Sequence, residues 1–139
     1  MKYRRESQRV FVRLETGEDL HASLLELAER EGITGGAVTA LGAIRDAVLG
    51  FYNLERREYD RTSVPGEVEL ASAVGTLSRL DGKPHLHLHA VVSDRECRTY
   101  GGHLFSAEVG ATVEIFVRVA DALIERTPDE ATGLSLWRV

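Results

Sequence analysis

Short segments in which apolar and polar residues alternate recur along this chain of 139 residues, and they constrain its fold more than any other feature. In residues 9–15, RVFVRLE, the apolar side chains of Val10, Val12 and Leu14 fall on one side of the chain. That period of two is typical of a β-strand with one buried face. The same kind of pattern predicts strands over residues 43–54, 67–80, 85–93, 99–105 and 112–119.

Turn-forming residues separate these segments. Residues 81–84, DGKP, and residues 94–98, DRECR, predict two tight turns. Residues 56–66 predict a short edge strand that ends in a turn, and two short pieces around Pro128 and Gly133 complete the chain. Consecutive strands that are joined by tight turns run antiparallel, so the sequence predicts a mainly antiparallel sheet.

One segment near the N-terminus has the period of a helix. Leucine and alanine recur at helical spacing over residues 18–31, and Gly32 can end the helix in a left-handed conformation. Thr16 is the expected N-cap, with Asp19 three residues later. The predicted fold class is therefore α+β, with a mainly antiparallel sheet and one main helix.

Composition limits the size and the class of the protein. A hydrophobic content of 43% in 139 residues suits one core, so residues 1–139 are expected to form a single domain. The net charge of −5 excludes a uniformly basic nucleic-acid binder. The single Cys97 cannot form an internal disulfide, and the chain has neither a secretory signal nor a long apolar run. We expect a soluble, cytoplasmic protein that does not enter a membrane.

Four of the five histidines, His85, His87, His89 and His103, fall within nineteen residues, and only His21 lies outside this cluster. On a strand, the histidines of the run HLHLH point to one face at intervals of about 7 Å. Neighbouring imidazoles of such a row can share one metal ion, and three imidazoles are a known zinc ligand set. The alternative is a solvated polar face without a metal.

His103 is the expected third ligand, because the predicted turn at residues 94–98 can fold its strand back beside the histidine row. Gly101 and Gly102 would let the two backbones approach closely. Zinc bound by His87, His89 and His103 is therefore the predicted metal centre. Carboxylates that accept a hydrogen bond from the outer nitrogen of each ring could orient the imidazoles, and the candidates are Glu69, Glu108 and Glu114.

The motifs GKPHLHLHAVVSDRECRTYGGHLF and TVEIFV, preceded by RLETGEDL and VELASAVGTL, resemble the PPC domain, the plants and prokaryotes conserved domain. The resemblance extends from about Arg9 to Val119 and implies an α+β fold with a mainly antiparallel sheet that assembles as a homotrimer. In plants this domain accompanies AT-hook motifs in nuclear proteins, whereas in prokaryotes it stands alone at about this length.

The resemblance also implies roles for individual residues. The HxH pair of the family corresponds to His87 and His89, and its GGHL histidine corresponds to His103. Glu69 and Glu114 match two family glutamates. Two positions depart from the family pattern: His85 replaces a more usual apolar residue, and Cys97 replaces a more usual turn glycine.

Three functions follow as alternatives. The first is a metal-binding oligomeric module that serves assembly or regulation, and the second is a metal-dependent enzyme of unknown substrate with the same three histidines. The third is DNA binding, by analogy with the plant proteins. The chain has no Arg-Gly-Arg core of an AT-hook, and three copies would carry a net charge of −15, from −5 each. The basic N-terminal cluster of Lys2, Arg4, Arg5 and Arg9 is expected to be a solvated tail.

Overall fold

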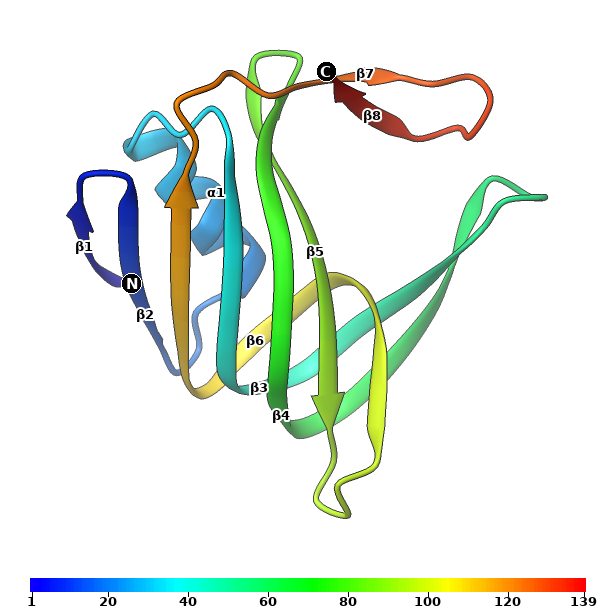
Figure 1. Ribbon diagram of the computed structural model, residues 1–139. Helices are drawn as coiled ribbons and strands as arrows, with labels where there is room; N and C mark the ends of the chain where they lie inside the picture. The colour runs from blue at the N-terminus through cyan, green and yellow to red at the C-terminus, as the bar shows by residue number, and fades with distance from the viewer.

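A computed structural model describes all 139 residues, and it shows one curved sheet of eight strands with a single helix (Figure 1). The strand order is β1-β2-β6-β3-β4-β7-β8, and β5 pairs with both β4 and β6. Every pairing is antiparallel except that of β4 with β7. The helix α1 is too short and too polar to cross a membrane. The elements are β1 Lys2–Glu6, β2 Arg9–Glu15, α1 Leu20–Arg30, β3 Gly36–Asn53, β4 Glu58–Leu80, β5 Lys83–Ser93, β6 Thr99–Val119, β7 Glu125–Pro128 and β8 Ser135–Arg138.

The structure confirms the mainly antiparallel sheet and the single helix near the N-terminus. Strand β2 has the predicted bounds, with Val10, Val12 and Leu14 buried and the residues between them exposed. These side chains and the apolar face of α1 enclose one core between the helix and the sheet. Its largest fully buried members include Leu20, Leu24, Leu27, Leu77, Leu88 and Leu104.

The helix start differs from the prediction. Asp19, not Thr16, is the N-cap, because its Oδ1 atom accepts a hydrogen bond of 2.7 Å from the backbone N–H of Ala22. The Thr16 hydroxyl instead donates to the carbonyl of Ala111, which ties the loop before α1 to β6. Gly32 follows the helix at a φ of +61°, as expected.

Three strands are longer than the sequence pattern predicts. β3, β4 and β6 contain 18, 23 and 21 residues, whereas shorter strands with intervening turns were expected. The predicted turn after residues 56–66 is wrong: the chain passes through Pro65 and Gly66 as an irregular point of β4. There the Asp46 carboxylate accepts the Gly66 N–H at 2.9 Å, and Gly66 has a φ of +77°. A bulge accommodates proline inside a ladder because a bulge needs fewer N–H donors.

The N-terminal segment is also not the expected solvated tail. Residues Lys2–Glu6 form β1 at the sheet edge, although their side chains stay exposed. Three of the four basic side chains in the predicted cluster pair with carboxylates. The pairs are Lys2–Glu15, Arg4–Glu6 and Arg5–Glu31.

Candidate metal centre

Strand β5 presents its histidines on the face of the sheet that lies away from the core. Leu86 and Leu88 are buried, whereas His85 and His87 are half-buried and His89 is exposed. This alternation follows from the strand period, since the leucines take the core side. The predicted row of imidazoles is therefore present.

The turn after β5 brings His103 to this row. The carboxylate of Asp94 accepts backbone N–H bonds from Glu96 and Arg98 at 3.0 Å each and so closes the turn. Cys97 lies in that turn with a φ of +61°, a conformation that glycine adopts more readily. Beyond the turn β6 pairs with β5, and His103 is the register partner of His89.

The three predicted ligands converge. One nitrogen of each of His87, His89 and His103 lies within 4.8 Å of the others. The Nε2 atoms of His87 and His89 are 3.1 Å apart. Two nitrogens bound to one tetrahedral zinc ion at about 2.0–2.1 Å would be about 3.3 Å apart. His87 and His89 are already near this separation, and the nitrogen of His103 would have to move closer to join them.

Burial keeps these imidazoles ready to act as ligands. Burial, followed by the neighbouring His87 and His89, lowers the pKa of His103 to about 4. Burial is also the main cause that lowers the pKa of His87. Both rings are therefore neutral near pH 7, and neutral imidazole is the form that binds metal. The Nδ1 atom of His103 is buried without a hydrogen-bond partner, so a metal bound at this nitrogen would relieve the cost of its burial.

Aromatic rings that the sequence analysis did not identify pack around His103. The Tyr59 ring from β4 lies 5.0 Å from its ring, centre to centre, and the Phe105 ring from β6 lies 4.6 Å away. Tyr59 belongs to the outer part of the β3–β4 hairpin, more than forty residues from His103 in sequence. Because only the bending of the long strands brings it here, no local pattern could have indicated this contact.

The remaining two histidines contribute to the electrostatics of the site. After burial, His87 and His89, the charges of His21 on α1 and His85 on β5 also lower the pKa of His103. Each has a buried Nδ1 atom without a partner. His21 is distant from the other histidines in the sequence, and only the packing of α1 brings the helix close to β5.

The three candidate carboxylates lie elsewhere. Glu108 forms an ion pair with Arg45. Glu69 is the register partner of Ser93, which is four residues, or about 13 Å, along β5 from His89. Glu114 lies opposite Arg13, on the other side of β3 and β4 from β5. None of the three forms a hydrogen bond with an imidazole.

Comparison with solved structures shows the same fold in several organisms. A metal-containing protein from Archaeoglobus fulgidus is 37% identical, with all of both chains covered and a TM-score of 0.88. A plant- and prokaryote-conserved (PPC) protein from Pyrococcus horikoshii is 28% identical, with 99% of this chain and 94% of that chain covered and a TM-score of 0.88. A protein from Bacteroides thetaiotaomicron, described as a candidate DNA-binding protein, is 25% identical, with coverages of 99% and 96% and a TM-score of 0.95.

Comparison of sequences identifies the family. The bifunctional protein GlmU of a Synechococcus strain is 35% identical over 136 residues, which are 91% of this chain. The chain spans only about a fifth, 20%, of the length of that relative. A sequence model of one domain family matches residues 1–121, which include all three converging histidines. The chain therefore belongs to the Plants and Prokaryotes Conserved (PCC) domain family.

Proposed function

We propose that this protein is a metal-binding module in which His87, His89 and His103 hold one divalent ion, zinc by preference. The convergence of three ring nitrogens from two strands within 4.8 Å carries the proposal. Three neutral nitrogen ligands suit zinc, and they leave a fourth coordination position for water or another ligand. The similarity to the metal-containing archaeal protein supports the same conclusion.

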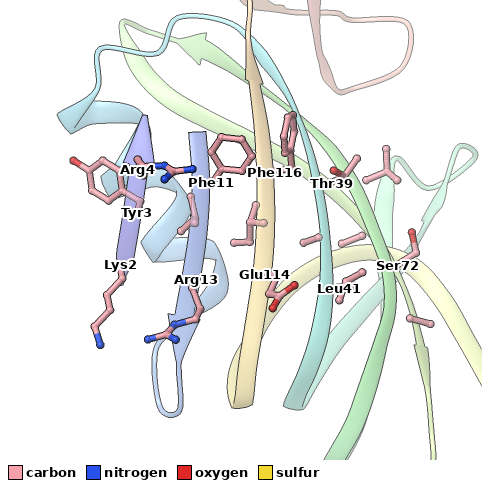
Figure 2. A pocket seen from close by; sticks show the side chains of 16 residues that line it. Lys2, Tyr3, Arg4, Phe11, Arg13, Thr39, Leu41, Ser72, Glu114 and Phe116 are labelled. Carbon is pink, nitrogen blue, oxygen red and sulfur yellow. The ribbon is translucent and has the colours of Figure 1, made fainter. Parts of the chain in front are cut away.

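The proposed module is a homotrimer. An open groove of about 800 Å³ crosses the sheet face opposite α1, over strands β1, β2, β6, β3 and β4 (Figure 2). Phe11 and Phe116 stack edge to face in it with ring centres 5.1 Å apart, and Leu41 and Val74 are more than half exposed. Because a soluble chain rarely leaves such an apolar face in water, we propose that a second copy covers it. The number of three copies rests on the family resemblance.

A metal-dependent enzyme is the second candidate. A three-histidine zinc centre with an open position can lower the pKa of bound water to about 7 and so generate a nucleophile. The aromatic enclosure by Tyr59 and Phe105 favours this candidate, because it restricts water on one side of His103.

DNA binding is the less favoured candidate, and it rests on relatives that are described as candidate DNA-binding proteins. Lys2, Arg4 and Arg5 form ion pairs with acids of the same chain, which reduces their charge for phosphate contacts. A duplex titration at low salt tests this function, because electrostatic contacts are strongest there. The exposed free thiol of Cys97 suits a cytoplasmic location, which we also propose.

The decisive experiment is elemental analysis of protein that is purified without added metal. We expect about one zinc or similar ion per chain. The double variant His87→Ala, His89→Ala should contain none, while its circular dichroism spectrum stays that of the parent protein. Metal-free parent protein that also fails to take up added zinc would overturn the proposal.

A further inference from the structure

Arg126 on β7 is the one basic side chain that is both partly buried and without an acidic partner. Nine of the seventeen Lys and Arg side chains form ion pairs with carboxylates. Of the other eight, only Arg126 is not fully exposed. Burial lowers its pKa, and no carboxylate offsets that effect. A partly desolvated cation without a counter-ion costs stability, and an anionic ligand would offset that cost.

The guanidinium of Arg126 is held in place by neutral groups. Its Nε atom donates to the Ser78 hydroxyl at 2.9 Å, and Nη1 donates to the Ser135 carbonyl at 2.7 Å. Ser78 is 1% exposed, and its hydroxyl donates in turn to the carbonyl of His85 at 3.4 Å. The guanidinium also lies 5.9 Å from the ring centre of Trp137. These contacts fix the orientation of the cation without neutralising it.

Hydrogen-bond donors remain for a ligand. A guanidinium has five N–H groups, and the protein uses one on Nε and one on Nη1. Nη2 has no protein partner and is not among the fully buried unpaired atoms. A free pair of terminal N–H groups matches the two oxygens of a carboxylate or phosphate group.

The same guanidinium lies beside the histidine cluster. Ser78, which holds Arg126, is the register partner of His85, and His87 follows two residues later on the same face of β5. The Arg126 guanidinium donates to Ser78, whose hydroxyl in turn contacts the His85 carbonyl, so Arg126 lies beside the start of the histidine row. Its charge also contributes to the lowered pKa of His85 and His87. An oxyanion at Arg126 would therefore lie next to the proposed metal centre.

We propose that Arg126, oriented by Ser78 and Ser135, binds the oxyanion group of a small ligand whose other end reaches the His87, His89 and His103 centre. The contact between the ligand and the metal ion rests on the proposed function, whereas the oxyanion site at Arg126 does not. The ligand class is a small organic acid or phosphate-type anion, because both groups present paired oxygens to the guanidinium. In the enzyme candidate, this arrangement would select anionic substrates and orient them toward the open coordination position.

Trp137 provides the readout, because it is the only tryptophan of the chain and lies beside Arg126. Acetate and methylphosphonate are titrated at constant ionic strength while Trp137 fluorescence and the heat of binding are followed. Parent protein, Arg126→Gln and the control Arg138→Gln are compared, each with and without zinc. Arg138 suits the control because it flanks Trp137 and is exposed, with Glu125 opposite it rather than the histidine row.

We expect saturable binding to the parent protein and to Arg138→Gln, and a loss of at least about tenfold in affinity in Arg126→Gln, the size of a charged hydrogen bond. The anion that binds with the higher affinity identifies the ligand as a carboxylate or a phosphate-type group. If Arg126→Gln does not fold, Arg126→Lys replaces it, and the same loss is expected because an ammonium group lacks the planar fork.

Equal affinity in the parent protein and Arg126→Gln, or no saturable binding of either anion, would overturn the oxyanion site. A parent protein that binds the anion but takes up no zinc would retain this site and reject the proposed metal centre. If the protein binds zinc but its affinity for the anion is the same with and without the ion, only the proposed contact between the ligand and the metal centre is rejected.

Discussion

His89 and His103 face each other as register partners in the antiparallel ladder of β5 and β6, with ring centres 5.6 Å apart. Side chains of directly opposed residues begin about 5 Å apart at Cβ, so the ladder itself sets the spacing of these two imidazoles. His87, two residues from His89 on the same face, then completes the group. The geometry of the candidate site thus depends on regular strands rather than on a loop.

Single alanine substitutions should distinguish the three converging histidines from His85, the further histidine on β5. We expect His103→Ala to weaken zinc binding by on the order of a hundredfold, because three ligands become two. His85→Ala should retain the affinity of the parent protein, since His85 is not among the converging nitrogens. Competition with a chromophoric chelator measures the zinc affinity of both variants. Equal losses in the two variants would contradict the assignment of His103 as a ligand.

The two glycines before His103 should respond differently to alanine. A Cβ atom on Gly102 would lie 2.7 Å from the carbonyl oxygen of Gly50, whereas one on Gly101 would find its nearest neighbour at 3.4 Å. Gly102→Ala should therefore push β6 away from β3, lower the free energy of unfolding by about 1–3 kcal/mol and weaken zinc binding. Gly101→Ala is the matched control.

Urea titrations measure the free energy of unfolding of these two variants, and chelator competition measures their zinc affinity. A small effect of Gly102→Ala on both quantities would show that the close contact with Gly50 does not position His103. A loss in stability without a loss in zinc affinity would assign the contact to the fold alone.

The sequence predicted those parts of the fold that depend on local periodicity. β2 has its predicted bounds, and α1 lies inside the predicted residues 18–31, because alternation and helical spacing reflect which side chains face the core. The turn at residues 94–98 also follows from the sequence and predicts that the strand of His103 lies beside the HLHLH strand, and the structure pairs His103 with His89 there. Strands linked by a short turn have few alternative pairings.

The remaining features depend on contacts that are distant in the sequence. Pro65 and Gly66 are usual in turns, yet the Asp46 carboxylate on the neighbouring strand stabilises a bulge there and β4 continues. The contact of Tyr59 with His103 results from the bending of the long strands, and the packing of α1 against β5 brings His21 toward that strand. Spacing along the chain contains no information about either contact.

Metal-free protein should lose stability as the pH falls from about 6.5 to about 4. The pKa of His103 decreases from an ordinary 6.5 to about 4 in the folded protein, mainly because of burial. The unfolded chain therefore binds a proton in this range while the folded protein does not, so stability is present above pH 6.5 and decreases as the pH is lowered. Urea midpoints measured across this range test the prediction.

The matched control for the pH series is His103→Gln, which removes the titrating ring and keeps a polar side chain. We expect a smaller decrease in its urea midpoint between pH 6.5 and pH 4 than in the parent protein. The acids of the chain titrate in both proteins, so the difference between the two curves isolates His103. Parallel curves would show that burial of this ring does not affect the acid stability.

Self-association through the groove should depend on Leu41 and not on Phe51. Both are exposed apolar residues of β3, at 56% and 71%, but only Leu41 lines the groove. Each also lies opposite an acid, Leu41 opposite Glu114 and Phe51 opposite Asp60, so a lysine at either position gains a cross-strand partner. Leu41→Lys should dissociate the proposed trimer, because it would place a charge in the apolar face that we propose a second copy covers, whereas Phe51→Lys should leave the assembly intact. Sedimentation equilibrium distinguishes these outcomes, and a parent protein that sediments as a monomer would reject the assembly itself.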